Sequence, residues 1–338
     1  MTTVFEQEIR SQGALIRARA TKGFDQATRA VAAWGDLTHC LVAARGSSDN
    51  AAIFFQYLVG RETGLLVALA APSLFERGPV GLDGAGVLVI SQSGRSPGLL
   101  DVVEQARRQG RPSVAITNDP STPLAGACDV VIELGAGVEH AIASTKTFST
   151  TWHAVAQLAS VMAHSPLEGL GGLGDVVMHA ADELLRLDVP DVLLGARGLT
   201  VVGRGVGYAV AREIALKVRE VAGVRAEAFS AADFLHGPIG ADGTDAVLLV
   251  VLTDEMGDEL ASEVLNGSRA MGMTTVVVRP TSRVEFDSDA QVVVADAPNW
   301  VLGLVEVVFG QVLSLRMGER RGRPIDTAPG LAKVTLSA

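Results

Sequence analysis

The chain has 338 residues, of which 48% are hydrophobic and 20% charged, with 37 Gly and 13 Pro. This length suggests about two compact domains, and the composition is that of a globular α/β protein, which excludes a disordered, collagen-like or coiled-coil chain. Because 28 Lys and Arg stand against 38 Asp and Glu, the formal net charge is -10, and we expect no general binding to nucleic acid.

The cysteine content and the apolar stretches indicate the compartment. Cys40 and Cys128 are too few for a disulfide framework or a four-ligand zinc site, so a reducing compartment is expected. Residues 1–9 contain two glutamates and do not resemble a signal peptide. The stretch Trp300–Leu315 is interrupted by a glutamate and a glutamine, and is predicted to be a helix buried against protein. We therefore expect a cytoplasmic protein that does not span a membrane.

The first half of the chain alternates predicted helices and strands. Helical spacing extends from about residue 1 to residue 30. A second helix is predicted from Ser48 through Tyr57, and a third after the loop Ser91–Ser96, running to Gln109. Apolar strands are predicted at residues 38–44, near Leu65, and at 86–90, 113–117 and 130–134. Continuous apolar strands of this kind are typical of a parallel sheet covered on both faces.

The second half repeats the pattern of the first. Strands at residues 199–202, 246–252 and 274–278 follow their counterparts at an offset of about 160 residues. A helical stretch, 165–194, joins the halves, with a turn at 169–174. We interpret the chain as two tandem copies of one doubly wound α/β domain.

Two loops at predicted strand ends are rich in hydroxyl groups. Gly46-Ser47-Ser48 opens a predicted helix, where backbone N–H groups and the helix dipole suit a phosphate. The loop Ser91–Ser96 offers the same features, and neither loop is a Walker A or dinucleotide-binding sequence. Ordinary N-capping by serine explains either loop alone. Two such clusters at successive strand ends favour a phosphate site.

Three charged residues share one face of the helix predicted at 208–222. Glu213, Lys217 and Glu220 are spaced by four and three residues, which also fits a solvated surface ion pair. Further along, His236 precedes a Gly-Pro turn, where its ring is available as a proton carrier.

The order of these motifs resembles the sugar isomerase (SIS) domain family, which includes the isomerase half of glucosamine-6-phosphate synthase. The resemblance covers nearly the whole chain. It is carried by Gly46-Ser-Ser48, Ser91-Gln-Ser-Gly94, Ala143-Ser-Thr-Lys146, Ala215-Leu-Lys-Val-Arg-Glu220, Ala226-Glu-Ala-Phe229, His236-Gly-Pro238 and Leu331-Ala-Lys333. It implies two tandem SIS domains, each a parallel sheet flanked by helices. The expected divisions are 1–165 (first domain with its N-terminal helix), 166–195 (linker helix), 196–325 (second domain) and 326–338 (a tail that closes on the active site).

The resemblance also implies site residues. Glu220 would move a proton between C1 and C2 of the opened sugar, with Lys217 stabilising the developing negative charge. His236 would open the ring of a sugar held by the neighbouring subunit, which implies a homodimer. Lys333 would close over the substrate and meet its carbonyl as an amine. The substrate and its phosphate would be held by Gly46, Ser47, Ser48, Ser91, Gln92, Ser93, Ser96, Ala143 and Ser144. No metal ligand and no cofactor are expected.

These roles predict an enzyme acting on a phosphorylated amino sugar. The chain starts at Met1-Thr2, without the N-terminal cysteine of a glutaminase, so we expect no ammonia production from glutamine. It is similar instead to stand-alone SIS-type glucosamine-6-phosphate deaminases, which form fructose 6-phosphate and ammonia. Two other substrates stay open, galactosamine 6-phosphate and a phosphorylated fructosyl-amine, the second of which would make the protein a deglycase. A non-catalytic phosphosugar sensor is the contrasting class.

Overall fold

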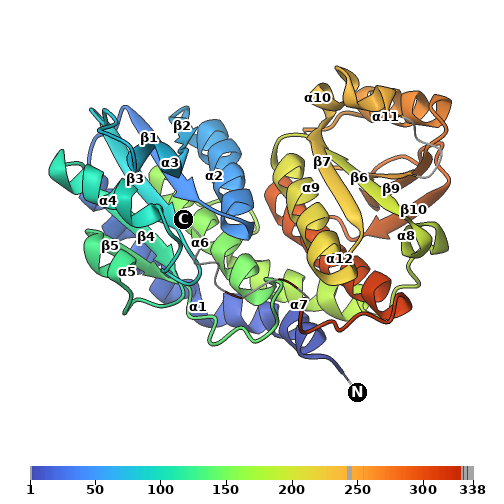
Figure 1. The fold of residues 1–338 in the computed structure, drawn as a ribbon, viewed down its shortest axis with the longest axis horizontal. Helices are drawn as coiled ribbons and strands as arrows, with labels where there is room; N and C mark the ends of the chain where they lie inside the picture. The colour runs from blue at the N-terminus through green and yellow to red at the C-terminus, as the bar shows by residue number, and fades with distance from the viewer. Residues whose placement is uncertain (1, 242–245, 254, 329, 331–332, 334–338) are drawn as a thin grey trace. The chain divides into compact units, whose positions relative to one another are not determined.

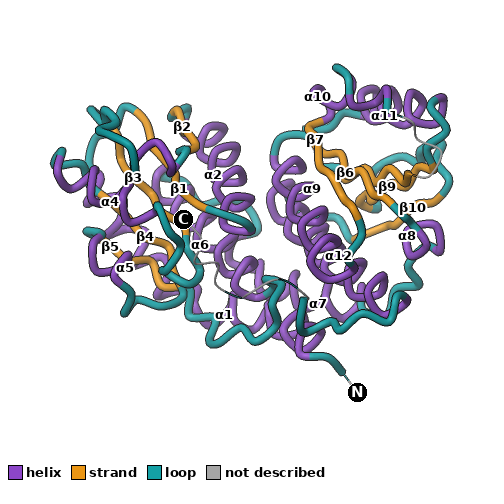
Figure 2. Tube along the Cα trace, in the orientation of Figure 1, coloured by secondary structure: helices purple, strands orange, loops and turns teal. Residues whose placement is uncertain are grey.

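The computed structural model describes residues 2–241, 246–253, 255–328, 330 and 333. Its contacts divide the chain into two units, each containing one sheet (Figures 1 and 2). The N-terminal unit comprises Ala14–Glu139, Lys146–Gly174 and Leu331–Ala338, and the C-terminal unit comprises Met1–Gly13, His140–Thr145 and Asp175–Gly330. The domain limits expected from the sequence stay predictions. Of the expected tail, residues 329, 331–332 and 334–338 lie outside the described part of the chain.

The N-terminal unit has a five-stranded parallel sheet in the order β2-β1-β3-β4-β5. All six residues of β3 are buried, which explains its continuous apolar sequence. On the helices, Phe54 and Trp152 stack with ring centroids 3.5 Å apart. The strands are β1 (His39–Ala44), β2 (Leu66–Leu69), β3 (Ala85–Ile90), β4 (Ser113–Thr117) and β5 (Val130–Glu133). The helices are α1 (Val4–Trp34, in this unit from Ala14 on), α2 (Ser47–Thr63), α3 (Pro72–Phe75), α4 (Leu99–Arg108), α5 (Pro123–Ala127), α6 (Lys146–Met162) and a 3-10 turn (Leu170–Gly172).

The C-terminal unit has a second parallel sheet, in the order β10-β9-β8-β6-β7. The predicted helix 208–222 is here an α-helix that continues into a π-helical turn. The strands are β6 (Gly198–Gly203), β7 (Arg225–Ser230), β8 (Ala246–Val251), β9 (Thr274–Pro280) and β10 (Ala290–Val294). The helices are α7 (Leu173–Leu184, in this unit from Asp175 on), α8 (Asp191–Gly195), α9 (Val206–Lys217), the π turn (Val218–Ala222), α10 (Ala231–Leu235), a 3-10 turn (Pro238–Gly240), α11 (Asp258–Ala270) and α12 (Asn299–Arg320).

The two sheets have the same topology. Reading β6 to β10 as the counterparts of β1 to β5 makes the two strand orders identical. The counterparts β1 and β6 start 159 residues apart, at His39 and Gly198, and β4 and β9 start 161 apart, at Ser113 and Thr274. The internal repeat expected from the sequence is therefore present in the strand order. The strands β7 and β10, which lie at the edges of their sheet and mix buried with half-buried or exposed residues, were not expected.

The most apolar helix is a core element. By length and composition α12 qualifies as a membrane span, yet 94% of its apolar window is buried inside the protein. The expectation of a buried helix at Trp300–Leu315 is confirmed. Cys40 and Cys128 are both free thiols, and burial raises the pKa of the Cys128 thiol to about 12.

Candidate functional site

The first hydroxyl-rich loop of the N-terminal unit lies where β1 ends and α2 begins. Gly46 occupies the N-cap position with φ 61° and ψ -133°, a conformation that favours glycine, and Ser47 and Ser48 are the first two residues of α2. Because a glycine has no side chain, the N-terminal N–H groups of α2 receive no cap from its N-cap residue. Serine N-capping, the alternative explanation for this motif, does not apply here. The loop presents backbone donors and two half-buried hydroxyl groups.

The second hydroxyl-rich loop follows β3, the neighbour of β1 in the sheet. The Oγ atoms of Ser91 and Ser96 lie 3.2 Å apart, and the loop turns at Gly94, whose φ is 62°. The sequence suggested that this loop opens a helix, which is wrong, since α4 begins only at Leu99. Both loops nevertheless lie at the carboxyl ends of adjacent parallel strands, where ligands bind in open α/β sheets.

A third loop, after β4, was not predicted as part of the site. The backbone N–H of Asn118 donates to the carbonyl of Gln92 at 3.1 Å, which ties this loop to the second one. The Thr122 side chain lies against Gly94, where an added Cβ would come within 2.2 Å of its Oγ1. Single asparagines and threonines in loops give no distinctive sequence signal, so only the fold brings them to this edge.

The charged face of α9 is buried. The side chains of Glu213 and Lys217 are 0% and 1% exposed, and that of Glu220 is 21% exposed. Lys217 Nζ donates to a carboxylate oxygen of Glu220 and lies 3.5 Å from Glu213 Oε1. The shared face predicted from the spacing is confirmed, and a solvated surface pair is excluded. Burial makes such a group of charges costly unless each is paired, which is common where a protein performs chemistry.

Glu220 also lies on an unusual backbone. The α-helix changes to a π-helical turn at Val218–Ala222, which contains this residue. Single π turns occur frequently at functional sites, because the extra residue reorients the side chains that follow. Arg219, its neighbour, donates to the carbonyl of Ala226 at the start of β7 and anchors the turn.

His236 lies on the surface of the C-terminal unit. It is the C-cap residue of α10, its backbone N–H donates to the carbonyl of Asp233 at 3.2 Å, and the residue is exposed. Gly237 follows with φ 155°, and Pro238 starts a 3-10 turn. The turn predicted from the sequence is present, and the ring is accessible to a ligand or to another molecule.

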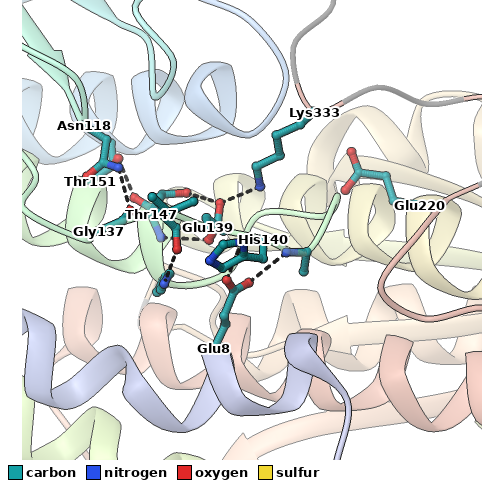
Figure 3. Close-up of polar contacts among 12 residues, drawn as sticks. Glu8, Asn118, Gly137, Glu139, His140, Thr147, Thr151, Glu220 and Lys333 are labelled. Carbon is teal, nitrogen blue, oxygen red and sulfur yellow. Dashed lines mark hydrogen bonds and ion pairs between the residues drawn. The ribbon is translucent and has the colours of Figure 1, made fainter. Parts of the chain in front are cut away.

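In the segment after β5, the buried carboxylate of Glu139 pairs with Lys333, which lies near the C-terminus (Figure 3). Lys333 Nζ donates to Glu139 Oε2 at 2.8 Å, and Thr147 donates to the same carboxylate through its backbone N–H (3.1 Å) and its hydroxyl (2.5 Å). The side chain of Glu139 is fully buried. It was not expected as a site residue, although it lies just before the Ala143–Lys146 motif.

The expected binding residues Ala143 and Ser144 belong to the C-terminal unit, with the rest of His140–Thr145. Ala143 is buried and Ser144 half-buried. The same short segment is held by Glu8, whose carboxylate accepts the backbone N–H groups of His140 at 2.7 Å and Ala141 at 3.3 Å. Glu8 was not expected to have this role, since a glutamate in a predicted helix is most often solvated.

Among the described residues, no group of three or more His, Cys, Asp and Glu side chains is placed to hold a metal ion.

The protein thus combines two doubly wound parallel sheets with hydroxyl-rich loops at adjacent strand ends and a buried carboxylate–ammonium group on a helix. Residues 37–161 match the family model of the SIS domain. The resemblance to the SIS domain family that the motifs suggested is therefore confirmed by a match over this segment.

Individual relatives extend the similarity beyond the matched segment. The chain is 29% identical over 312 residues to a glutamine–fructose-6-phosphate aminotransferase (isomerizing) of Aeropyrum pernix, covering 87% of this chain and 50% of the relative. The chain spans about half the length of the curated relatives that it matches.

Solved structures share the fold. A chain from Silicibacter pomeroyi, provisionally named a phosphosugar isomerase, is 29% identical with a TM-score of 0.84, over 96% of this chain and 99% of that one. A glucosamine-6-phosphate deaminase from Thermotoga maritima has a TM-score of 0.78 at 21% identity, over 98% of this chain and 99% of that one. At 21% identity the second likeness concerns the fold alone.

Proposed function

We propose that this protein is an amino-sugar-phosphate deaminase that converts glucosamine 6-phosphate and water into fructose 6-phosphate and ammonia. The observation that carries the proposal is the buried Lys217–Glu220 pair on the π-helical turn. A carboxylate held by an ammonium and still 21% exposed is suited to take a proton from a bound substrate. The SIS-domain match and the phosphosugar enzymes among the similar proteins support this substrate class.

The phosphate would be bound by the hydroxyl-rich loops. Backbone N–H groups at the start of α2 and the hydroxyls of both loops are donors that match a phosphate dianion. The proposed binding residues are Gly46, Ser47, Ser48, Ser91, Gln92, Ser93, Ser96, Ala143 and Ser144.

The proton transfers would follow ring opening, which we assign to His236 contributed by a second copy of the chain. Glu220 would then remove the proton from C2 of the open-chain aldehyde and return it to C1 through an enolamine. This transfer leaves an imine at C2, which water hydrolyses to the ketone with release of ammonia. Lys217 would stabilise the negative charge that develops on the sugar oxygen, and Lys333 would interact with the carbonyl.

The test measures ammonia release and fructose 6-phosphate formation from glucosamine 6-phosphate. We expect the wild type to turn over and Glu220→Gln to lose about 10²–10⁴-fold in kcat, the usual contribution of a general base. The matched control is Glu263→Gln on the exposed side of α11, which should behave as the wild type.

Two results would contradict the proposal. Turnover that survives in Glu220→Gln would show that Glu220 is not the base of the reaction. Turnover only of galactosamine 6-phosphate or of a phosphorylated fructosyl-amine would show that this compound, and not glucosamine 6-phosphate, is the substrate. Tight phosphosugar binding with no turnover of any of the three would indicate a sensor.

A further inference from the structure

We propose that Glu139 is the positioning residue for Lys333, so that this buried carboxylate sets where the ammonium of the C-terminal segment is held. The inference rests on the proposed function for its catalytic consequence. The contact itself lies within the N-terminal unit and is independent of that function.

Thr147 holds the Glu139 carboxylate independently of Lys333. Thr147 is the second residue of α6, and its backbone N–H belongs to the first turn of this 17-residue helix. The Glu139 carboxylate therefore lies at the positive end of the helix dipole, where an anion is stabilised. Because one Thr147 donor binds Oε1 and the other binds Oε2, the orientation of the carboxylate is determined from two sides.

The backbone that carries Glu139 is also tied down. The side-chain amide of Asn118 donates to the carbonyl of Gly137 at 2.8 Å, and Lys146 Nζ donates to the carbonyl of Val138 at 2.7 Å. The two residues before Glu139 are thus both held by side chains, as Figure 3 shows for Asn118 and Gly137. The segment between β5 and α6 therefore holds the Glu139 carboxylate through several hydrogen bonds.

Lys333 has the opposite character. Its side chain is 27% exposed, and a lysine has four rotatable bonds that an isolated surface position leaves free. The charged acceptor at 2.8 Å favours one region for the ammonium. A purely structural ion pair of this kind would matter for stability alone. A positioning pair changes the chemistry of Lys333.

The first arm of the experiment needs no substrate. The rate of acylation of each lysine by acetic anhydride is measured by mass spectrometry in the full-length wild type, in Glu139→Gln and in Thr147→Val. We expect Lys333 to react about 10-fold faster in Glu139→Gln, which corresponds to ~1.4 kcal/mol of lost interaction, with an intermediate rate in Thr147→Val. Lys22, which pairs with Glu133 on the same unit, is the internal comparator.

The second arm is kinetic and uses the phosphosugar that the wild type turns over. We expect Glu139→Gln to lower kcat about 10-fold with little change in KM, and Glu139→Asp to recover part of the loss. In the double variant with Lys333→Met, the Glu139 substitution should add nothing, because its effect passes through the lysine. Glu133→Gln is the matched control and should leave kcat unchanged.

The two arms separate the possible failures. If no phosphosugar is turned over, the proposed function fails while the acylation arm still decides the positioning. An unchanged acylation rate of Lys333 in a folded Glu139→Gln protein overturns the inference. Multiplicative kinetic effects in the double variant also overturn it, since they would show that Glu139 acts independently of Lys333.

Discussion

Arg19, His153 and Gln157 form a buried polar cluster that makes the stability of the N-terminal unit depend on pH. Arg19 Nη1 donates to His153 Nδ1 and to Gln157 Oε1, both at 2.8 Å. Burial, with a smaller contribution from the Arg19 charge, lowers the pKa of His153 to about 3. The histidine is therefore neutral in the folded protein across the physiological range.

We expect acid to destabilise the protein through this residue. An unfolded histidine binds its proton near pH 6.5, so between about pH 6.5 and 3 the unfolded state holds more protons than the folded one. The free energy of unfolding should fall by up to ~1.4 kcal/mol per pH unit as the pH drops through this window. Urea unfolding from pH 8 to 4 would measure this slope. In His153→Gln the contribution should vanish, and an unchanged slope there would assign the acid sensitivity to other groups.

Glu306 should have the opposite effect. It is fully buried in α12, and neither carboxylate oxygen has a hydrogen-bond partner within the described part of the chain. Burial, with a smaller contribution from the nearby Glu255 carboxylate, raises its pKa well above the usual value. Stability is then complete below about pH 4.5 and declines as the pH rises towards the folded pKa.

Replacing this group should stabilise the protein in neutral and basic solution. Glu306→Gln keeps the shape and removes the titration, so we expect the free energy of unfolding at pH 8 to rise by roughly 1 kcal/mol or more, with little change near pH 4.5. Thermal unfolding at both pH values would test this. A variant that is equally destabilised at both would show that Glu306 is ionised and paired in the folded protein.

At the scale of elements, the two copies of the strand-to-helix loop differ in what covers them. Gly46 and Gly205 begin α2 and α9 with nearly the same backbone angles, 61°/-133° and 58°/-125°. A Cβ at Gly46 would meet no atom of the described residues within 4 Å, whereas one at Gly205 would lie 2.7 Å from the Glu255 Cγ. The second copy therefore has a carboxylate side chain over its helix start, where the first copy is open.

Alanine substitution should distinguish the two loops. Gly46→Ala should cost about 1–3 kcal/mol from backbone strain alone, and Gly205→Ala should cost more because of the clash. Adding Glu255→Ala should recover the excess in Gly205→Ala and leave Gly46→Ala unaffected. Equal costs at both positions, measured by denaturant unfolding, would mean that the Glu255 side chain moves away freely.

The composition of each element explains whether it could be predicted from the sequence. Fully buried strands such as β3 and β4, whose central residues are apolar, were located within one residue. Among the edge strands, β5 was located from its apolar residues, whereas β7, which contains two charged residues in six, and β10 were not predicted. The π turn at Val218–Ala222 was read as ordinary helix, because the residues that form it have normal helical spacing.

At the scale of the whole molecule, the proposed homodimer makes a direct prediction. If His236 acts on a substrate held by another copy of the chain, inactive Glu220→Gln and His236→Ala proteins should complement each other when their subunits are mixed. Random assortment would restore about a quarter of the wild-type activity, since half the dimers then contain one complete site of two. Mixing Glu220→Gln with Lys217→Met should restore nothing, because both residues belong to one α9 region. Failure of the first mixture, with exchange of subunits verified by mass, would place His236 in its own chain's site.

The sequence by itself determined the alternation of helices and strands, the repeat near 160 residues, the hydroxyl-rich loops and the shared face of Lys217 and Glu220. These features are local, because burial of a strand or helix face is written into the spacing of apolar residues along that element. The expectations of a cytoplasmic location and of a particular sugar stay predictions.

Only the tertiary structure decided which distant side chains meet. Lys333 and Glu139 are 194 positions apart, and Gln12 bonds to Gln311 across 299. A glutamate such as Glu139, Glu8 or Glu306 is most often a solvated surface charge, so its sequence context alone favours that interpretation. The fold withdraws these carboxylates from water, and the choice between a paired, an anchored and a protonated group then depends on the donors that the surrounding elements bring to each one.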